Sequence, residues 1–126
     1  MKQKFFICRH CGNIVVMVKE SGRPIVCCGE NMKELVAGSV DASEEMHVPC
    51  YEVKENKVYV KIGEKPHPMT EDHYIQWISI QTCMGNQRKE LSPTDKPEAV
   101  FALLDKEEVQ AVYAYCNLHG LWMKCK

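Results

Sequence analysis

The chain has 126 residues, of which 45% are hydrophobic and 26% are charged, and its formal net charge is −1. These values describe a globular protein of one or two domains, without the basic excess of a nucleic-acid-binding protein or an acidic tail for a basic partner. The apolar run near the first residue is too short for a signal peptide or a membrane span. We therefore expect a cytoplasmic protein with no membrane or nucleic-acid partner.

Cysteine is the most informative residue type, with eight copies. In a reducing compartment, closely spaced cysteines indicate metal binding rather than disulfides. Cys8 and Cys11 form a C-x-x-C-G knuckle, and Cys27 and Cys28 follow after 15 intervening residues. Adjacent Cα atoms lie about 3.8 Å apart, closer than most disulfides allow. The pattern therefore predicts four thiolates around one tetrahedral metal.

Residues 1–36 are predicted to form a small hairpin-like domain around these cysteines. A β-prone run at 14–18 leaves the first cysteine pair, a turn signal at 21–24 reverses the chain, and the second pair follows. A domain of this size cannot bury a real core, so a bound metal would hold it together. Sequence alone does not distinguish zinc from iron in such a site.

The second predicted domain, residues 37–126, is built from short β-prone runs separated by turn residues. Val58, Val60 and Ile62 alternate with polar neighbours, and Glu55–Lys57 is a credible hairpin loop before them. Seven such strands predict an immunoglobulin-like antiparallel β-sandwich, so the whole chain is expected to be all-β. The seven runs are 35–40, 48–53, 58–62, 74–82, 99–104, 109–115 and 121–124.

Three further cysteines, Cys50, Cys83 and Cys125, fall in or beside these runs. Because free cysteine is one of the most buried residue types, we expect these three to be buried structural thiols.

Four histidines and one more cysteine lie in polar breaks of the second domain. Cys116 and His119 stand three residues apart in a short loop, and Pro66 and Pro68 stiffen the loop around His67. Five donors exceed the usual four ligands of zinc, and one sulfur among nitrogens suits a redox metal such as iron. The full predicted donor set is His47, His67, His73, His119 and Cys116.

Two alternatives remain open at this point. A blue-copper electron carrier would use Cys116, His119, Met123 and His47, but it would leave the other two histidines without a role. A zinc-stapled binding module without redox activity would use only the four N-terminal cysteines.

The motifs together resemble the desulfoferrodoxins, which are superoxide reductases with two iron sites. Residues 8–12 and 27–32 are similar to the family's desulforedoxin module, while 45–49, 67–75 and 115–122 are similar to motifs of its catalytic domain. The likeness covers the whole chain, and the motifs occur in the family's order.

The resemblance implies two iron ions per chain. In the second site the histidines would lie in one plane with Cys116 on the axis, and the sixth position would stay open for superoxide until Glu45 closes it in the ferric state. The first iron would be an electron-exchanging tetrathiolate held by Cys8, Cys11, Cys27 and Cys28, and the second would be held by His47, His67, His73, His119 and Cys116.

The implied reaction is the one-electron reduction of superoxide to hydrogen peroxide, a defence against oxidative stress that releases no oxygen. The implied partners are superoxide, a rubredoxin-like or other small electron donor, and a second copy of the chain in a homodimer. One position departs from the family, which usually has a lysine directly before its first histidine ligand, where this chain has Met46. Lys65, beside the His67 loop, is the best candidate for another base near the site.

Overall fold

The computed structural model describes residues 3–40 and 42–126, and the chain divides into two compact units, Met1–Val36 and Ala37–Lys126. Within the described residues, no helix has the length and hydropathy needed to span a membrane.

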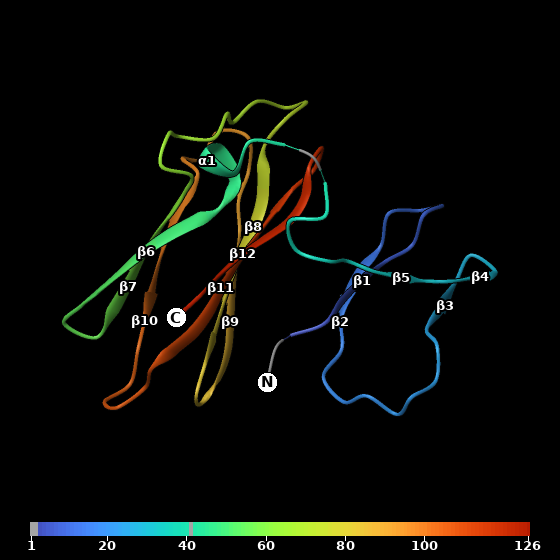
Figure 1. The fold of residues 1–126 in the computed structure, drawn as a ribbon, viewed down its shortest axis with the longest axis horizontal. Helices are drawn as coiled ribbons and strands as arrows, with labels where there is room; N and C mark the ends of the chain where they lie inside the picture. The colour runs from blue at the N-terminus through green and yellow to red at the C-terminus, as the bar shows by residue number, and fades with distance from the viewer. Residues whose placement is uncertain (1–2, 41) are drawn as a thin grey trace. The chain divides into compact units, whose positions relative to one another are not determined.

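The smaller unit is a pair of small antiparallel sheets around the four N-terminal cysteines (Figure 1). Phe5, Cys8 and Met32 are its buried residues, a core too small to stabilise a domain without further support. Three strands pair in the order β2-β1-β5, and two pair as β3-β4: β1 (Phe5–Ile7), β2 (Ile14–Val16), β3 (Val26–Cys27), β4 (Glu30–Asn31) and β5 (Lys33–Glu34).

The larger unit is a β-sandwich, which confirms the predicted fold class. Residues 42–126 contain seven strands in two antiparallel sheets, with strand orders β10-β7-β6 and β12-β11-β8-β9 (Figure 1). The elements are α1 (Glu44–His47), β6 (Pro49–Lys54), β7 (Lys57–Ile62), β8 (Ile75–Thr82), β9 (Gly85–Glu90), β10 (Glu98–Ala102), β11 (Val109–Cys116) and β12 (Gly120–Cys125).

The core between the two sheets follows from the period-two pattern of the strands. Val58, Val60 and Ile62 of β7 are buried, while their neighbours on the strand are exposed. The two-residue loop before β7 has Glu55 and Asn56 at positive φ, as a tight hairpin requires. Cys116 at the end of β11 belongs to this core and is fully buried, so one predicted metal ligand is anchored in the most rigid part of the fold.

One predicted strand is absent, and two elements of the structure were not predicted. Residues 35–40 form no strand, because Gly38 adopts a φ of +69° in a turn. The real seventh strand is β9, whose residues Gly85–Glu90 are nearly all polar because β9 is a sheet edge with much of its surface in solvent. The single turn α1 carries His47 and is too short to give a helical sequence period.

The expected burial of Cys50, Cys83 and Cys125 is also wrong, since all three are exposed free thiols. Cys50 follows buried Pro49 and therefore points away from the core, in agreement with the alternation along β6. Cys83 lies in the turn after β8, and Cys125 lies at the outer end of β12.

All segments with predicted histidine or Cys116 ligands lie at one end of the sandwich. α1 precedes β6, the 63–74 loop joins β7 to β8, and the 117–119 turn joins β11 to β12. Because β6 pairs antiparallel with β7, and β8 with β11, these connections meet at the same end of the sheets (Figure 1). Side chains more than 70 residues apart in sequence can therefore meet here.

Candidate metal centres

The four N-terminal cysteines form one cluster in the smaller unit, and all their sulfur atoms lie within 4.8 Å of one another. The Sγ atoms of Cys11 and Cys27 are 3.6 Å apart, and those of Cys27 and Cys28 are 4.0 Å apart. Sulfurs about 2.3 Å from a shared tetrahedral ion would lie about 3.8 Å apart. These distances are far too long for disulfide bonds and fit a four-coordinate metal.

Two tight turns present these cysteines. Gly12 and Gly29 follow the two pairs with φ of +81° and +75°, and Cys28 itself has φ +52°. In the first turn the backbone N–H of Gly12 donates to the carbonyl oxygen of Cys8. Such turns need residues that tolerate the left-handed region, which explains the glycine after each pair.

The thiols of this cluster differ in acidity. The backbone N–H of Cys11 is the main cause that lowers the pKa of Cys8 to about 6, whereas contacts with Cys11 and Cys8 raise the pKa of Cys28 to about 12. One thiolate therefore forms readily at neutral pH, and a further thiolate beside it is unfavourable. A bound cation would remove this conflict and displace the remaining protons.

The second cluster is a ring of four imidazoles at the loop end of the sandwich. Ring centroids of neighbouring imidazoles are 4.7 Å apart for His47–His67 and His67–His73, 5.1 Å for His73–His119 and 4.8 Å for His119–His47. The opposite pair, His47 and His73, is 6.4 Å apart. Neighbouring rings lie 76–89° from each other, so the four imidazoles form a nearly square set around one point.

The ring nitrogens that face this point have the spacing of ligands to one ion. His47 Nε2 lies 3.2 Å from His67 Nε2 and 3.0 Å from His119 Nδ1. Nitrogens about 2.1 Å from a common ion, and at right angles to each other, would be about 3.0 Å apart. His73 Nε2 is buried without a hydrogen-bond partner among the described residues. This unpaired nitrogen is an independent sign that the site is built for an ion.

Backbone carbonyls fix two of the imidazoles in the required orientation. His47 Nδ1 donates to the carbonyl of Ser43, and His67 Nδ1 donates to that of Pro68, both at 2.7 Å. A carbonyl can only accept, so the proton of each ring is on Nδ1 and the Nε2 lone pair faces the site. His73 lies in a turn that is closed by two backbone hydrogen bonds with Thr70.

Burial favours the neutral form of His47, His67 and His73. It lowers the pKa of His67 to about 4, and it also lowers the pKa values of His47 and His73. Neutral imidazole is the form that binds metals, so these three rings are in the metal-binding form at neutral pH.

Cys116 supplies a fifth donor. Its Sγ lies 3.8 Å from His119 Nδ1 and within 4.8 Å of the donor nitrogens of the other three histidines. Burial raises the pKa of Cys116, and hydrogen bonds from the backbone N–H groups of Leu118 and His119 act in the opposite direction. These N–H groups would stabilise the thiolate once a cation replaces its proton.

Asn117 joins the Cys116 loop to the His73 segment, a role that the sequence did not indicate. Its Oδ1 accepts from Tyr74 N at 2.9 Å, its Nδ2 donates to Asp72 O at 3.0 Å, and its own N–H donates to Tyr74 O at 3.2 Å. The position of an asparagine between two ligands was a possible signal, but its partners depend on the path of a distant loop.

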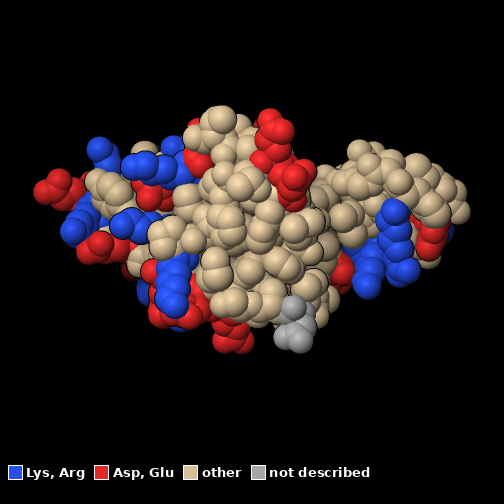
Figure 2. Space-filling model, turned by 90° about the horizontal axis from the view of Figure 1, so that it is seen from above, with Lys and Arg blue, Asp and Glu red and all other residues tan. Residues whose placement is uncertain are grey.

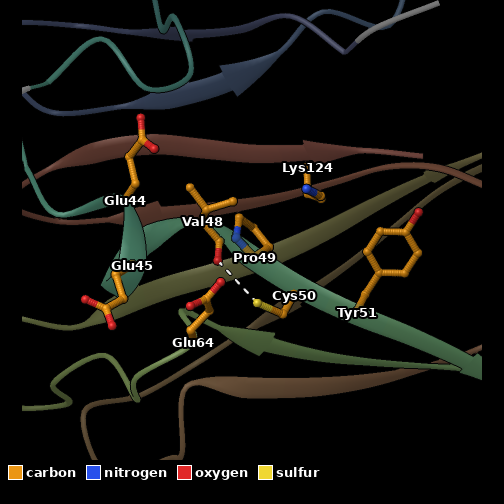
Figure 3. Close-up of a pocket in the computed structure, with 8 residues that line it drawn as sticks. All are labelled: Glu44, Glu45, Val48, Pro49, Cys50, Tyr51, Glu64 and Lys124. Atoms are coloured by element: carbon orange, nitrogen blue, oxygen red, sulfur yellow. Dashed lines mark hydrogen bonds between the residues drawn. The ribbon is translucent and has the colours of Figure 1, made fainter.

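Glu45 lies beside this centre rather than in it. Among the described residues, no carboxylate joins the cluster of histidine and cysteine donors. Glu45 Oε1 lies 3.6 Å from Lys65 Nζ, and both side chains are at least half exposed. Glu45 also lines a pocket beside α1, together with Glu44, Glu64, Cys50 and Lys124 (Figure 3). No histidine of the ring lines this pocket.

The geometry does not favour a blue-copper site. All four histidines take part in one ring, whereas such a site needs two. Met123 pairs with Tyr113 and points to the opposite face of β12 from Trp122, which stacks on His47. Four imidazoles with one sulfur exceed the usual four-ligand set of zinc and would suit a metal of higher coordination number, such as iron.

Comparison with known families agrees with this geometry. The family described as Desulfoferrodoxin matches residues 39–125, and the family described as Desulfoferrodoxin, N-terminal domain, matches residues 1–35.

Individual relatives match along nearly the whole chain. A desulfoferrodoxin homolog from Archaeoglobus fulgidus is 46% identical over 91% of this chain and 90% of its own length, and a desulfoferrodoxin from Syntrophotalea carbinolica is 44% identical over 96% and 94%. Among solved structures, the superoxide reductase from Treponema pallidum matches with a TM-score of 0.84 and 37% identity, over 98% of this chain and 99% of that one.

Proposed function

Because this chain belongs to the desulfoferrodoxin family, we propose that it is a superoxide reductase, which adds one electron and two protons to superoxide and releases hydrogen peroxide. The observation that carries the proposal is the square of four imidazoles with the buried Cys116 thiol beside it. The similarity to the superoxide reductase from Treponema pallidum supports it.

The proposed cofactors are two iron ions per chain. The second iron, when bound, would supply the electron that superoxide takes up. We assign the first iron to Cys8, Cys11, Cys27 and Cys28, and the second to His47, His67, His73, His119 and Cys116.

The ligand residues would do three things for this reaction. Neutral imidazoles add no negative charge, so the site with a bound ion keeps a positive charge that attracts a small anion. The Ser43 and Pro68 carbonyls hold two rings in place, so the site needs little rearrangement during turnover. The N–H groups of Leu118 and His119 tune how strongly the Cys116 thiolate donates electrons.

We further propose that Glu45 becomes the sixth ligand in the ferric state. Glu45 lies on α1, two residues before His47, so a small movement of this turn would carry its carboxylate toward the ring. It would first have to leave Lys65, and an exposed ion pair of this kind costs little to break.

Among the residues that the structure describes, no strongly basic surface is seen on the face that superoxide would approach (Figure 2). The view in Figure 2 looks onto the loop end of the larger unit, where the central surface is largely uncharged and charges of both signs lie around it. Met46 supplies no charge beside the first histidine. The bound ion and Lys65 are therefore the proposed sources of attraction for superoxide.

Electron supply and assembly complete the proposal. The exposed thiols Cys11 and Cys28 leave one side of the first centre near solvent, where a rubredoxin-like or other small donor could deliver electrons. The small core of the first unit would gain stability from a contact with a second copy of the chain in a homodimer.

All eight cysteines are free, which suits a reducing cytoplasm. Sedimentation velocity and reduction by rubredoxin would test the assembly and the donor.

The stoichiometry of the reaction tests the proposed activity. Pre-reduced protein is mixed with a pulse of superoxide, and hydrogen peroxide and oxygen are both measured. A reductase gives one peroxide for each superoxide without oxygen, while a dismutase gives half as much peroxide and releases oxygen. Oxygen release with half the peroxide, or no faster loss of superoxide than in buffer, would contradict the proposal.

A further inference from the structure

Trp122 contacts two of the four histidines in different ways. Its indole stacks on the imidazole of His47, with ring centroids 5.0 Å apart and planes 28° from parallel. Its Nε1–H donates a hydrogen bond to the backbone carbonyl of His119 at 3.0 Å. The side chain is only 4% exposed, so both contacts lie in a protected part of the sandwich end.

His47 has little local structure to hold it. It ends α1, which has four residues and no side-chain hydrogen bond from its N-cap Ser43. A turn this short is not stable alone and must be fixed by packing. Backbone N–H groups of Glu64 and Lys65 both donate to the carbonyl of Glu45 and so tie α1 to the segment before His67. The stack on Trp122 ties the His47 ring itself to β12.

His119 also depends on contacts outside its own turn to hold it in place. It lies in the three-residue turn between β11 and β12 and offers Nδ1, the ring nitrogen nearer to its own backbone, to the site. The position of Nδ1 therefore follows the backbone of this turn closely. The bond from Trp122 to the His119 carbonyl, three residues back in the chain, fixes that backbone.

We propose that Trp122 is a positioning residue of the histidine centre, which holds the His47 ring and the His119 backbone so that their nitrogens remain 3.0 Å apart. This inference rests on the proposed function only in taking the imidazole ring to be a metal centre. Groups that orient metal ligands typically change metal affinity by about 10- to 100-fold.

Trp77 is the matched control, because it is the other of the two tryptophans in the chain. It is 9% exposed and lies on β8, where it stacks on Tyr115 with centroids 5.7 Å apart. A leucine at either position removes the same volume from the same unit. A purely structural role for Trp122 would make the two substitutions equivalent at the metal centre.

The test is a Co²⁺ titration of the full chain after chelation of its metals. The absorption of tetrahedral Co²⁺ with four thiolates separates the cysteine site from the weaker bands of the five-coordinate histidine site. We expect Trp122→Leu to weaken Co²⁺ binding at the histidine site by about 10- to 100-fold and to leave the cysteine site unchanged. Trp77→Leu should leave both affinities within about twofold of the parent, by the same reasoning. Thermal unfolding of each variant shows whether a change in affinity merely follows lost stability.

Two kinds of contrary result separate the role of Trp122 from the existence of the metal centre. Parent-like affinity in Trp122→Leu, or equal weakening in Trp77→Leu, would overturn the positioning role alone. Absence of Co²⁺ binding at the parent's histidine site would overturn the metal centre, and the role with it.

A second pair of variants keeps the inference testable if Trp122→Leu does not fold. Trp122→Phe keeps an aromatic ring against His47 but loses the N–H donor, so we expect affinity to fall by about three- to tenfold, less than in the leucine variant. Trp77→Phe is its control. Equal affinities in these two variants would overturn the role of the hydrogen bond.

Discussion

Removal of the metal should make the larger unit sensitive to acid through His67. This residue is 2% exposed, and burial lowers its pKa to about 4, against about 6.5 for histidine in an unfolded chain. Between these two values the unfolded state binds the proton more readily than the folded state. The metal-free protein must therefore lose stability as the pH falls from about 6.5 to about 4, while His67 contributes no change above this window.

The size of the effect follows from the same values. A pKa that is about 4 in the folded protein and about 6.5 in the unfolded chain corresponds to a loss of about 3 kcal/mol in the free energy of unfolding at pH 4 and below. Burial also lowers the pKa values of His47 and His73, so their protonation adds to the loss. For a domain of this size, a loss of about 3 kcal/mol is a large part of the total stability.

Urea unfolding of the chelated protein at pH 7, 6, 5 and 4 measures this loss. Tryptophan fluorescence reports on the larger unit alone, because Trp77 and Trp122 are the only tryptophans in the sequence. His67→Gln should flatten the slope between about pH 6.5 and 4, while His10→Gln, in the smaller unit, should not. A parent protein whose free energy of unfolding stays constant over this range would refute the reasoning, as would an unchanged slope in His67→Gln.

Three further substitutions test separate parts of the proposed function. Cys28→Ser should remove the metal of the cysteine site and leave superoxide reduction by pre-reduced protein nearly intact; loss of that reaction with the second iron still bound would show that the two centres are not separable. Glu45→Ala should shift the ferric absorption band and admit azide, with little change in the rate of the first encounter with superoxide, and a ferric spectrum identical to that of the parent would refute its role as a ligand. Lys65→Ala should slow the second-order reaction by no more than about fivefold at low salt, because Lys65 is exposed and even unit charges about 4 Å apart interact by only about 1 kcal/mol in water. This difference should vanish at high salt. Met46→Lys should have the opposite effect; if neither variant changes the rate or its salt dependence, local cations do not guide superoxide.

Much of the fold could be predicted because the core strands have clear hydrophobic patterns in the sequence. The alternation of Val58, Val60 and Ile62 fixes one face of β7. In β8, isoleucine and tryptophan favour a strand, although polar residues interrupt them, and both faces of this strand are buried. β9 gave no such signal because an edge strand of polar residues resembles a loop. The burial of Cys50 was misjudged because a cysteine can face either side of a strand, and only the register decides which.

The residues that offer donor atoms to the site could be predicted, but the hydrogen bonds and contacts that orient them could not. Few residue types bind transition metals, and histidine and cysteine are among them. His47 and Cys116 could therefore be identified as candidate ligands from the sequence. Their orientation depends on the Ser43 and Pro68 carbonyls, and every residue has a carbonyl. The contacts of Asn117 and Trp122 also join segments far apart in sequence, and only the closed sandwich brings those segments together.

The central claim is that the imidazole ring and the Cys116 sulfur form one centre that reduces superoxide. Pulse radiolysis of Cys116→Ser and Cys50→Ser tests it most directly, because one cysteine is buried beside the ring and the other is exposed on β6. The account predicts that Cys116→Ser loses its second iron or reacts with superoxide at least about tenfold more slowly, while Cys50→Ser keeps the parent iron content and rate. Near-parent iron content and rate in Cys116→Ser would contradict the claim.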